Sequence, residues 1–517
     1  MKTTTDIDIC FLRARHPRAI HSRMGRGNLR WRLVAALALA LAAALSLVVA
    51  CGSDSGVQGG CEGAACEDAR ASEGSVPTEA GSETSATDGG ADALTDAGDA
   101  SDTGTNCTGP AGTLDPTFGD GGIVWLKYPS SGAYALATQT DGKLVVGGYT
   151  GGSGGNFAVV RVLPNGATDP SFGTGGLVET KVGNVNLEVH GLAVQPDGRI
   201  VAAGFSRPTG GRFRFVVLRY SSSGTLDPTF GTGGVVETPL GNREAYARSL
   251  ALQPDGKILV AGYSEDAFTP DGTADFEVVR YLADGSIDAS FGTGGRVTID
   301  MHGTRDELNA VAIGPGGKVL VAGYSSETGD DPIHTDVAVV QLDSSGALDT
   351  TFGIGGLFLS AFGGRQRANS LAFDPSGRVV LGGLNGTGSD FGIFRLTTAG
   401  ALDPSFGDGG AISHDFAARA DGVGFASVEP SGRILAVGSS IGGPNSGSIA
   451  AARYASNGAP DPSFGEGGIA LTAPPPNADI GGTATLLTGC SYITVGAWSY
   501  DNDTVPKTAM GIARFRR

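Results

Sequence analysis

Six polar residues could supply the chemistry of a binding or catalytic site in this chain. They are Glu179, Lys181, Glu237, Asp300, His414 and Asp415, and they replace apolar residues at comparable positions of short apolar segments. If these segments line a central channel, the six side chains form a polar mouth that could hold a small ligand or a glycan. Carboxylates gathered there with His414 could also transfer protons. If the segments lie elsewhere, the six residues are solvated strand ends.

Other patterns of catalytic and metal-binding residues are missing from the sequence. Beyond residue 50 the histidines are His190, His302, His334 and His414, and none has a second His or a Cys nearby, as a zinc site would need. Asp120, Asp408 and Glu466 share one position of a repeated motif, but no loop has the alternating carboxylates of a calcium-binding repeat. A nucleophile elbow and a phosphate-binding loop are missing too. We therefore expect no metal, no cofactor and no catalytic residue.

A nine-residue phrase occurs seven times and defines the organisation of the chain. It reads "LDPTFGDGG" from Leu114 and returns as "TDPSFGTGG", "LDPTFGTGG", "IDASFGTGG", "LDTTFGIGG", "LDPSFGDGG" and "PDPSFGEGG". Its Asp recurs every 54 to 61 residues, which indicates a repeat architecture over residues 113–517 rather than separate compact domains. The units are about 115–168, 169–226, 227–287, 288–348, 349–402, 403–460 and 461–517.

Each unit predicts four short β-strands. One unit contains the runs "RVTIDM", "LALQPDGK", "ILVAGY" and "FEVVRY", or their equivalents, bounded by Gly, Pro and Asp. No helical period occurs after residue 112. Antiparallel four-stranded sheets with two apolar faces pack face to face around a ring, so we expect an all-β fold, a seven-bladed β-propeller. An open β-solenoid is the alternative, but its rungs are shorter than these units. If blades straddle the units, the C-terminal "MGIARF" strand closes the ring.

The repeated phrase has a structural explanation at each position. Its Asp can accept backbone N–H groups in an Asx turn, its Phe suits a wedge between blades, and its Gly-Gly pair allows backbone angles that other residues resist. An Arg also recurs in the fourth run of every unit except one, which has Gln341. A buried Arg needs a carboxylate or carbonyl partner, and the Asp of the nearby phrase is the candidate.

These units resemble the delta-60 repeat family. The resemblance rests on "QPDGKILVAGY", "FEVVRY" and "DGSIDASFGTGG", and it covers about residues 113–517. The family is a domain of unknown function that is expected to form β-propellers in bacterial exported and surface proteins. The resemblance thus implies a fold and an exported location, and it carries over no catalytic residue. Unit seven departs from the pattern, with "LLTGCSYITVGAW" in place of the usual hairpin turn.

The N-terminal 50 residues are typical of an export signal. Arg26, Arg30 and Arg32 precede an apolar run from Leu33 to Ala50, which ends in "LVVAC". This ending resembles the bacterial lipobox, by which Cys51 would be acylated and become the first mature residue. An uncleaved membrane helix is the alternative, since the run could just span a bilayer. Met24 gives a conventional short signal, which favours it as the start and makes residues 1–23 an extension.

Residues 51–112 predict a disordered acidic linker. They contain twelve acidic residues against one Arg and almost no large apolar side chain, so they cannot form a core. Cys61 and Cys66 are spaced for a local disulfide in an oxidising compartment. Cys107 and Cys490 lie beside the first unit and within the last, so ring closure could pair them. Alternatively, Cys107 pairs with Cys61 or Cys66 or stays free.

Net charge and the repeat organisation limit the functions to consider. The formal charge is −17 and no basic run with aromatics follows residue 50, so we expect no nucleic-acid partner. We expect a monomer that is exported and lipid-anchored at the cell envelope, in the outer membrane or on the cell surface. Its propeller would be a binding or scaffolding module for an unknown protein or glycan. The alternative is an envelope enzyme, a lyase, hydrolase or sugar dehydrogenase, with its site at the channel mouth.

The lipid anchor gives the first testable prediction. Mass spectrometry of the mature protein should find an N-terminal peptide that begins at Cys51 and carries acyl chains, because the apolar run ends at a lipobox-like sequence. A Cys51→Ser variant is the control and should leave the signal uncleaved. A mature chain that begins elsewhere, or an unmodified Cys51, would contradict the prediction.

Overall fold

The structure is a computed structural model, and it describes most of residues 109–517. Within that range it leaves out residues 152–154, 184, 267–272, 302–304, 327–333, 361, 387–389, 417–419, 442–446, 473–477, 481–483, 489–490 and 501–506. The expected export signal and linker lie outside the described residues. The described part is all-β, as expected, with one single-turn 3₁₀ helix at Pro315–Gly317.

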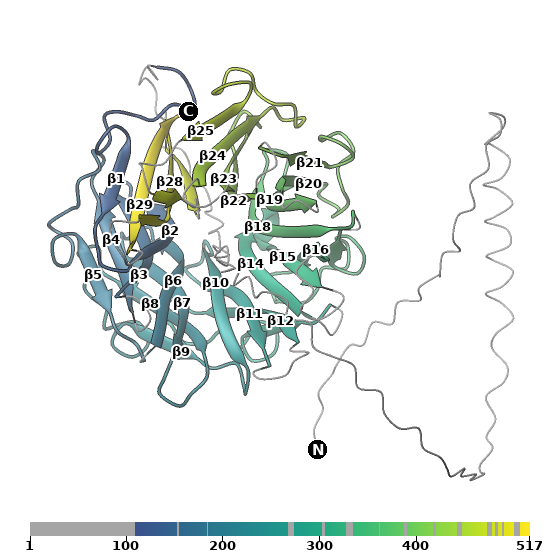
Figure 1. The fold of residues 1–517 in the computed structure, drawn as a ribbon. Helices are drawn as coiled ribbons and strands as arrows, with labels where there is room; N and C mark the ends of the chain where they lie inside the picture. The colour runs from purple at the N-terminus through teal and green to yellow at the C-terminus, as the bar shows by residue number, and fades with distance from the viewer. Residues whose placement is uncertain are drawn as a thin grey trace, which may run out of the picture. The chain divides into compact units, whose positions relative to one another are not determined.

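The strands pair in antiparallel groups of four that are arranged around a ring (Figure 1). We call each group a blade and name it by its innermost strand. The β2 blade contains β2 (Gly132–Thr138), β3 (Leu144–Thr150), β4 (Asn156–Val162) and β5 (Leu177–Thr180). The β6 blade contains β6 (Val185–Val194), β7 (Ile200–Arg207), β8 (Arg214–Tyr220) and β9 (Val235–Thr238). The β10 blade contains β10 (Glu244–Leu252), β11 (Ile258–Glu265), β12 (Ala274–Tyr281) and β13 (Arg296–Ile299).

The ring continues with three further blades of the same strand order. The β14 blade contains β14 (Arg305–Ile313), β15 (Val319–Ser326), β16 (Thr335–Leu342) and β17 (Leu357–Leu359). The β18 blade contains β18 (Arg365–Phe373), β19 (Val379–Gly386), β20 (Asp390–Leu396) and β21 (Ala411–His414). The β22 blade contains β22 (Ala420–Val428), β23 (Ile434–Ile441), β24 (Gly447–Tyr454) and β25 (Ile469–Thr472).

The two ends of the chain share one sheet, which we call the closing blade. It contains β26 (Ala478–Ile480), β27 (Ala484–Thr488), β28 (Ser491–Tyr500), β29 (Lys507–Arg516) and, from the N-terminal side, β1 (Ile123–Leu126). Ile123 lies opposite Ala513 in the β1–β29 pair. The Gly112 N–H donates to the Arg516 carbonyl at 2.9 Å, and the Arg516 N–H donates to the Thr113 carbonyl at 2.8 Å. The C-terminal strand therefore closes the ring with the first strand.

Blades straddle the sequence repeats by one strand. The segment after each Gly-Gly pair, such as β5 or β9, is the outermost strand of its sheet, and the next segment begins the following blade. Apolar cores lie between neighbouring blades; one of them joins Val145 and Val159 of the β2 blade to Leu192 and Val216 of the β6 blade. Both faces of a blade are thus buried, which explains why its strands are apolar on both sides.

Neighbouring blades meet at a contact that the repeated phrase builds, and we call this contact the joint. The Asp169 Oδ1 accepts the Ser171 N–H at 3.0 Å in an Asx turn, and its Oδ2 accepts Arg161 Nε at 2.9 Å. Arg161 also donates to the Ser222 carbonyl of the next blade and lies 4.6 Å from the centroid of the Phe172 ring. One guanidinium therefore binds its own blade and the neighbouring blade.

The joint recurs around the ring with little variation. The equivalent ion pairs are Arg219–Asp227, Arg280–Asp288, Arg395–Asp403, Arg453–Asp461 and Arg514–Asp115, with N–O distances of 2.8 to 2.9 Å. Each phrase Phe is buried, with at most 1% of its surface exposed: Phe118, Phe172, Phe230, Phe291, Phe352, Phe406 and Phe464. These contacts confirm the predicted partner of the repeated Arg and the predicted wedge role of the Phe.

One joint has Gln341 in place of the Arg. Its positive charge comes instead from Lys318, which lies just before β15. Gln341 Nε2 donates to Asp349 Oδ2 at 2.7 Å, and Lys318 Nζ reaches the same oxygen at 2.7 Å. The equivalent Lys257 stays 3.9 Å from Asp288, where Arg280 is present. The Lys318 hydrogen bond is the largest of the contacts that hold the pKa of Asp349 well below its usual range.

Lys318 should therefore contribute more to the free energy of unfolding than its counterpart Lys257 does. We expect Lys318→Ala to lower the free energy of unfolding by roughly 1 kcal/mol, because its side chain is part-exposed, and Lys257→Ala to cost less than half as much. Gln341→Arg should rescue Lys318→Ala. Because the folded pKa of Asp349 is depressed, the Lys318 contribution is present above about pH 3.9 and is lost as acid protonates Asp349. Urea unfolding at pH 7 measures these costs; equal costs for the two lysines would contradict the account.

Candidate functional site

The innermost strands are where the repeats differ most in chemistry. Each of the six that can be compared has a bulge, which inserts one extra residue opposite the second strand of its blade. The extra residues are Tyr134, His190, Arg248, Asn309, Asn369 and Gly424. Bulges redirect side chains and are common beside functional sites. The bulges are therefore the first place to look for a ligand-binding group.

Aromatic rings form a continuous arc along the inner parts of the β2, β6 and β10 blades. Tyr134 stacks on His190 with ring centroids 4.6 Å apart, and His190 stacks on Phe205 at 5.3 Å. Phe205 meets Tyr246 edge-on at 5.1 Å, and Tyr246 lies 5.1 Å from Tyr263. We call this set of five rings the aromatic arc.

Charged groups lie against the aromatic arc. The Arg248 guanidinium is 5.5 Å from the centre of the Tyr263 ring and 6.0 Å from that of Phe205. His190 Nε2 is 2.8 Å from Glu188 Oε2, while burial lowers the pKa of His190 and outweighs the opposing effect of Glu188. Tyr246 and Arg248 are half-buried, so one part of the arc is open to solvent. The other four rings, Tyr134, His190, Phe205 and Tyr263, are buried, with 1 to 7% of their surface exposed, so a ligand would reach the arc at Tyr246 and Arg248.

The residues at the same positions change around the ring. Where the β10 blade has Tyr263, the β14, β18 and β22 blades have Tyr324, Leu384 and Ser439. The Arg367 guanidinium of the β18 blade lies 4.2 Å from the centre of the Tyr324 ring.

The β22 blade is chemically plain at these positions. Where the β10 blade has Tyr246 and Arg248, the β22 blade has Gly422 and Gly424. Ring and charged side chains are therefore missing from these positions at the β22 blade.

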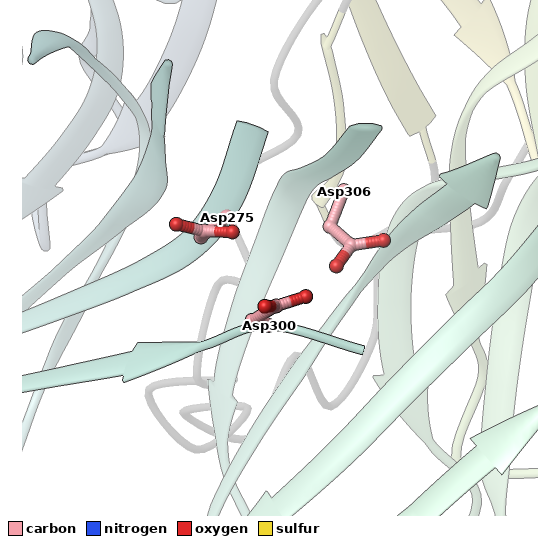
Figure 2. Close-up of side chains that lie close together, drawn as sticks. All are labelled: Asp275, Asp300 and Asp306. Carbon is pink, nitrogen blue, oxygen red and sulfur yellow. The ribbon is translucent and has the colours of Figure 1, made fainter. Parts of the chain in front are cut away.

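A second group of functional side chains lies between the β10 and β14 blades. Figure 2 shows Asp275 on β12, Asp300 just after β13 and Asp306 on β14, with their carboxylates facing one another. One oxygen of each lies within 4.8 Å of the other two; Asp275 and Asp306 are buried and Asp300 is exposed. We call these three residues the acidic trio. Asp306 Oδ2 accepts the Met301 N–H at 2.8 Å, and Arg243 donates to Asp275.

Burial keeps two of the three carboxyls from ionising readily. Burial raises the pKa of Asp275 to about 6, although Arg243 opposes the shift. It raises the pKa of Asp306 to about 7, and the charges of Asp300 and Asp275 add to this effect while the Ser325 hydroxyl and the Met301 N–H oppose it. The two buried carboxyls therefore keep their protons to a higher pH than ordinary aspartates do.

The six residues singled out in the sequence do not come together. Glu179, Lys181, Glu237, Asp300, His414 and Asp415 lie on, or just after, outermost strands of different blades, because the segments that carry them end their sheets. Glu179 accepts a hydrogen bond from Thr150, Glu237 lies 3.6 Å from Arg214, and the His414 ring is 4.7 Å from Phe416. Asp300 joins the acidic trio. The proposed lipidation and disulfide residues, Cys51, Cys61, Cys66, Cys107 and Cys490, lie outside the described residues.

Sequence reasoning missed the other two members of the trio and the aromatic arc. A signal for the trio was present, because the positions of Asp275, Asp300 and Asp306 are occupied by Asp390, Asp415 and Asp421 in the β18 and β22 blades. The signal appears only when the repeats are aligned by strand pairing. The bulges carry no comparable signal, since one inserted residue leaves the apolar pattern nearly unchanged.

A family model identifies the repeats. The model described as "Domain of unknown function (DUF5122) beta-propeller" matches residues 139–172, 195–230, 253–291, 315–352, 375–406 and 429–464. These six segments, which together make up less than half of the chain, are similar to repeats of an uncharacterised β-propeller family. Each match begins at the turn before the second strand of a blade and ends in the phrase, within the joint. The matched segments of this propeller thus contain the joints, and its innermost strands, with the bulges, lie outside them.

Known structures and curated proteins add no functional information. A protein from Lactobacillus plantarum is 14% identical, with 72% of this chain and 98% of that chain covered and a TM-score of 0.36. An ulvan lyase bound to its saccharide is 9% identical, with coverages of 78% and 94% and a TM-score of 0.37. The aldose sugar dehydrogenase of Escherichia coli is 13% identical, with coverages of 61% and 95% and a TM-score of 0.34. No curated protein matches, and no helix among the described residues could cross a membrane.

Proposed function

We propose that this protein is a ligand-binding module of the cell envelope, and that the aromatic arc is its binding surface. The observation that carries the proposal is the run of rings from Tyr134 to Tyr263, open to solvent at Tyr246, with Arg248 and Glu188 beside it. Ligand sites combine apolar and aromatic walls with a few polar groups that fix orientation. The joints account for the repeated residues structurally, so the arc is left as a surface with specific chemistry.

A glycan is the ligand class that this surface fits best. Sugar rings present C–H faces that pack on Tyr and Phe rings, and their hydroxyls accept hydrogen bonds from Arg and donate them to carboxylates. A nucleic acid does not fit a chain with a net charge of −17 and no basic run along its repeats. An aromatic surface of this kind would hold neutral or weakly acidic saccharides.

The module would be a closed ring of seven blades that acts as a monomer at the end of its linker. The seven phrases and the shared sheet of β1 and β29 support this count, although the family model matches six segments. We further propose that Cys51 anchors the chain by lipid and that residues 51–112 hold the propeller away from the membrane. Such a tethered ring needs no catalytic group. An envelope enzyme is the alternative, and Glu188 with His190 would be its proton-transfer pair.

A saccharide microarray tests the proposed surface directly. The full chain should bind at least one neutral or acidic oligosaccharide, and Tyr246→Ala and Arg248→Ala should each weaken that binding by roughly tenfold or more, because each removes a contact worth about 1.4 kcal/mol or more. Ser439→Ala, at the position equivalent to Tyr263 in the chemically plain β22 blade, is the matched control and should bind as the wild type does.

Two results would contradict the binding proposal. One is wild-type protein that binds no saccharide on the array. The other is equal binding by the Tyr246→Ala, Arg248→Ala and Ser439→Ala variants. Shortened saccharides in the incubation medium, lost in a His190→Ala variant, would instead establish the enzyme.

A further inference from the structure

We propose that the acidic trio of Asp275, Asp300 and Asp306 binds one Ca²⁺ ion and links the β10 blade to the β14 blade. The proposal is independent of the saccharide surface. Two of the ligands come from the β10 blade and the third from the β14 blade, so a bound ion would bridge two sheets that are otherwise held by the joint and the apolar core.

The spacing of the trio fits calcium. Ca²⁺ takes oxygen ligands at about 2.3 to 2.6 Å, so two of its ligand oxygens can be up to about 5 Å apart. The three carboxylate oxygens here lie within 4.8 Å of one another. Mg²⁺ demands near-ideal octahedral geometry and usually keeps several waters, so a site of three carboxylates suits Ca²⁺ better. Asp300 is exposed, so water can complete the six to eight ligands that Ca²⁺ takes.

A buried oxygen without a partner points independently to a ligand. Asp306 has no exposed surface, and its Oδ2 is occupied by the Met301 N–H. Among the described residues, its Oδ1 has no hydrogen-bond partner. A buried carboxylate oxygen left in this way is costly, and a cation is a common reason for keeping one. Figure 2 shows the Asp306 carboxylate directed toward the space that it shares with Asp300 and Asp275.

Charged groups of both signs lie around the trio. Arg243 pairs with Asp275 and also lies 3.7 Å from Asp266, while Arg296 is engaged by the buried Glu277. Glu277 itself adds to the negative potential at Asp275, which favours a cation there.

The counterpart residues Asp390, Asp415 and Asp421 supply a natural control. They occupy the same strand positions one pair of blades further on, and Asp421 Oδ2 caps the Phe416 N–H at 2.7 Å just as Asp306 caps Met301. Asp390 is turned to the Ser413 hydroxyl at 3.2 Å. Among the described residues, only the trio brings three carboxylate oxygens within 4.8 Å, so we assign calcium to it and not to the counterpart.

Calorimetry and thermal unfolding of the purified full chain test this assignment. After treatment with EDTA and dialysis, CaCl₂ should bind and should raise the melting temperature by several degrees. Asp300→Asn and Asp306→Asn should each weaken this binding by roughly tenfold or more, because each removes a charged ligand. Asp415→Asn and Asp421→Asn should bind Ca²⁺ as the wild type does. The acidic linker is identical in all variants, so its weak binding cancels in the comparison.

Three outcomes would overturn the proposal. The first is wild-type protein whose melting temperature does not respond to CaCl₂. The second is equal loss of affinity in Asp300→Asn and Asp415→Asn, which would show a general charge effect. The third is MgCl₂ binding as tightly as CaCl₂. Asp300 is exposed, so Asp300→Asn keeps the test valid even if Asp306→Asn fails to fold.

Discussion

The ion pair between a buried Arg and the Asp of the repeated phrase is the interaction on which the ring depends. At each joint that has it, the guanidinium binds the Asp of its own blade and lies over the phrase Phe at 4.4 to 4.9 Å. At most of these joints it also donates to a carbonyl of the next blade. A buried charge is costly unless it is fully paired, so an Arg that has these partners fixes the angle between two blades. The Gln341 joint obeys the same rule, because Lys318 restores the missing charge.

Because the joints lie toward the outer strands, they leave the innermost strands free to vary. Asn309 and Asn369 use their bulge positions structurally, since each donates to a carbonyl of the next inner strand at 3.1 and 2.9 Å. Tyr134, His190 and Arg248 use the same position for rings and charge. Equivalent bulge positions thus hold structural residues in some blades and residues suited to ligand binding in others. The boundaries between blades differ in the same way, because the carboxylates of the acidic trio converge at one boundary whereas those of the counterpart residues do not converge at theirs.

The sequence was sufficient for the joint but not for the site. The all-β fold, the four strands per unit, the buried Phe and the Arg–Asp partnership followed from residue types that each unit repeats. The sequence period indicates four strands, but it does not indicate which of them is innermost, so it left open whether Glu179 and Glu237 line a channel or lie at strand ends. They lie on the outermost strands β5 and β9. Asp275 and Asp306 meet across a blade boundary, which only tertiary packing determines. Local sequence therefore determines the features that every blade shares. The candidate binding groups depend on which strand is innermost and on how neighbouring blades pack together.

A double-mutant cycle at one joint tests this account most directly. Arg280 and Asp288 suit it, because their side chains are 5% and 8% exposed, their N–O distance is 2.8 Å, and the neighbouring Lys257 stays 3.9 Å from Asp288. Urea unfolding of Arg280→Ala, Asp288→Ala and the double variant gives the coupling free energy. The account predicts single costs of about 3 to 5 kcal/mol and a double variant that costs much less than their sum, because each single change leaves a buried charge unpaired. Additive costs, or single costs below about 1 kcal/mol as at an exposed ion pair, would contradict it.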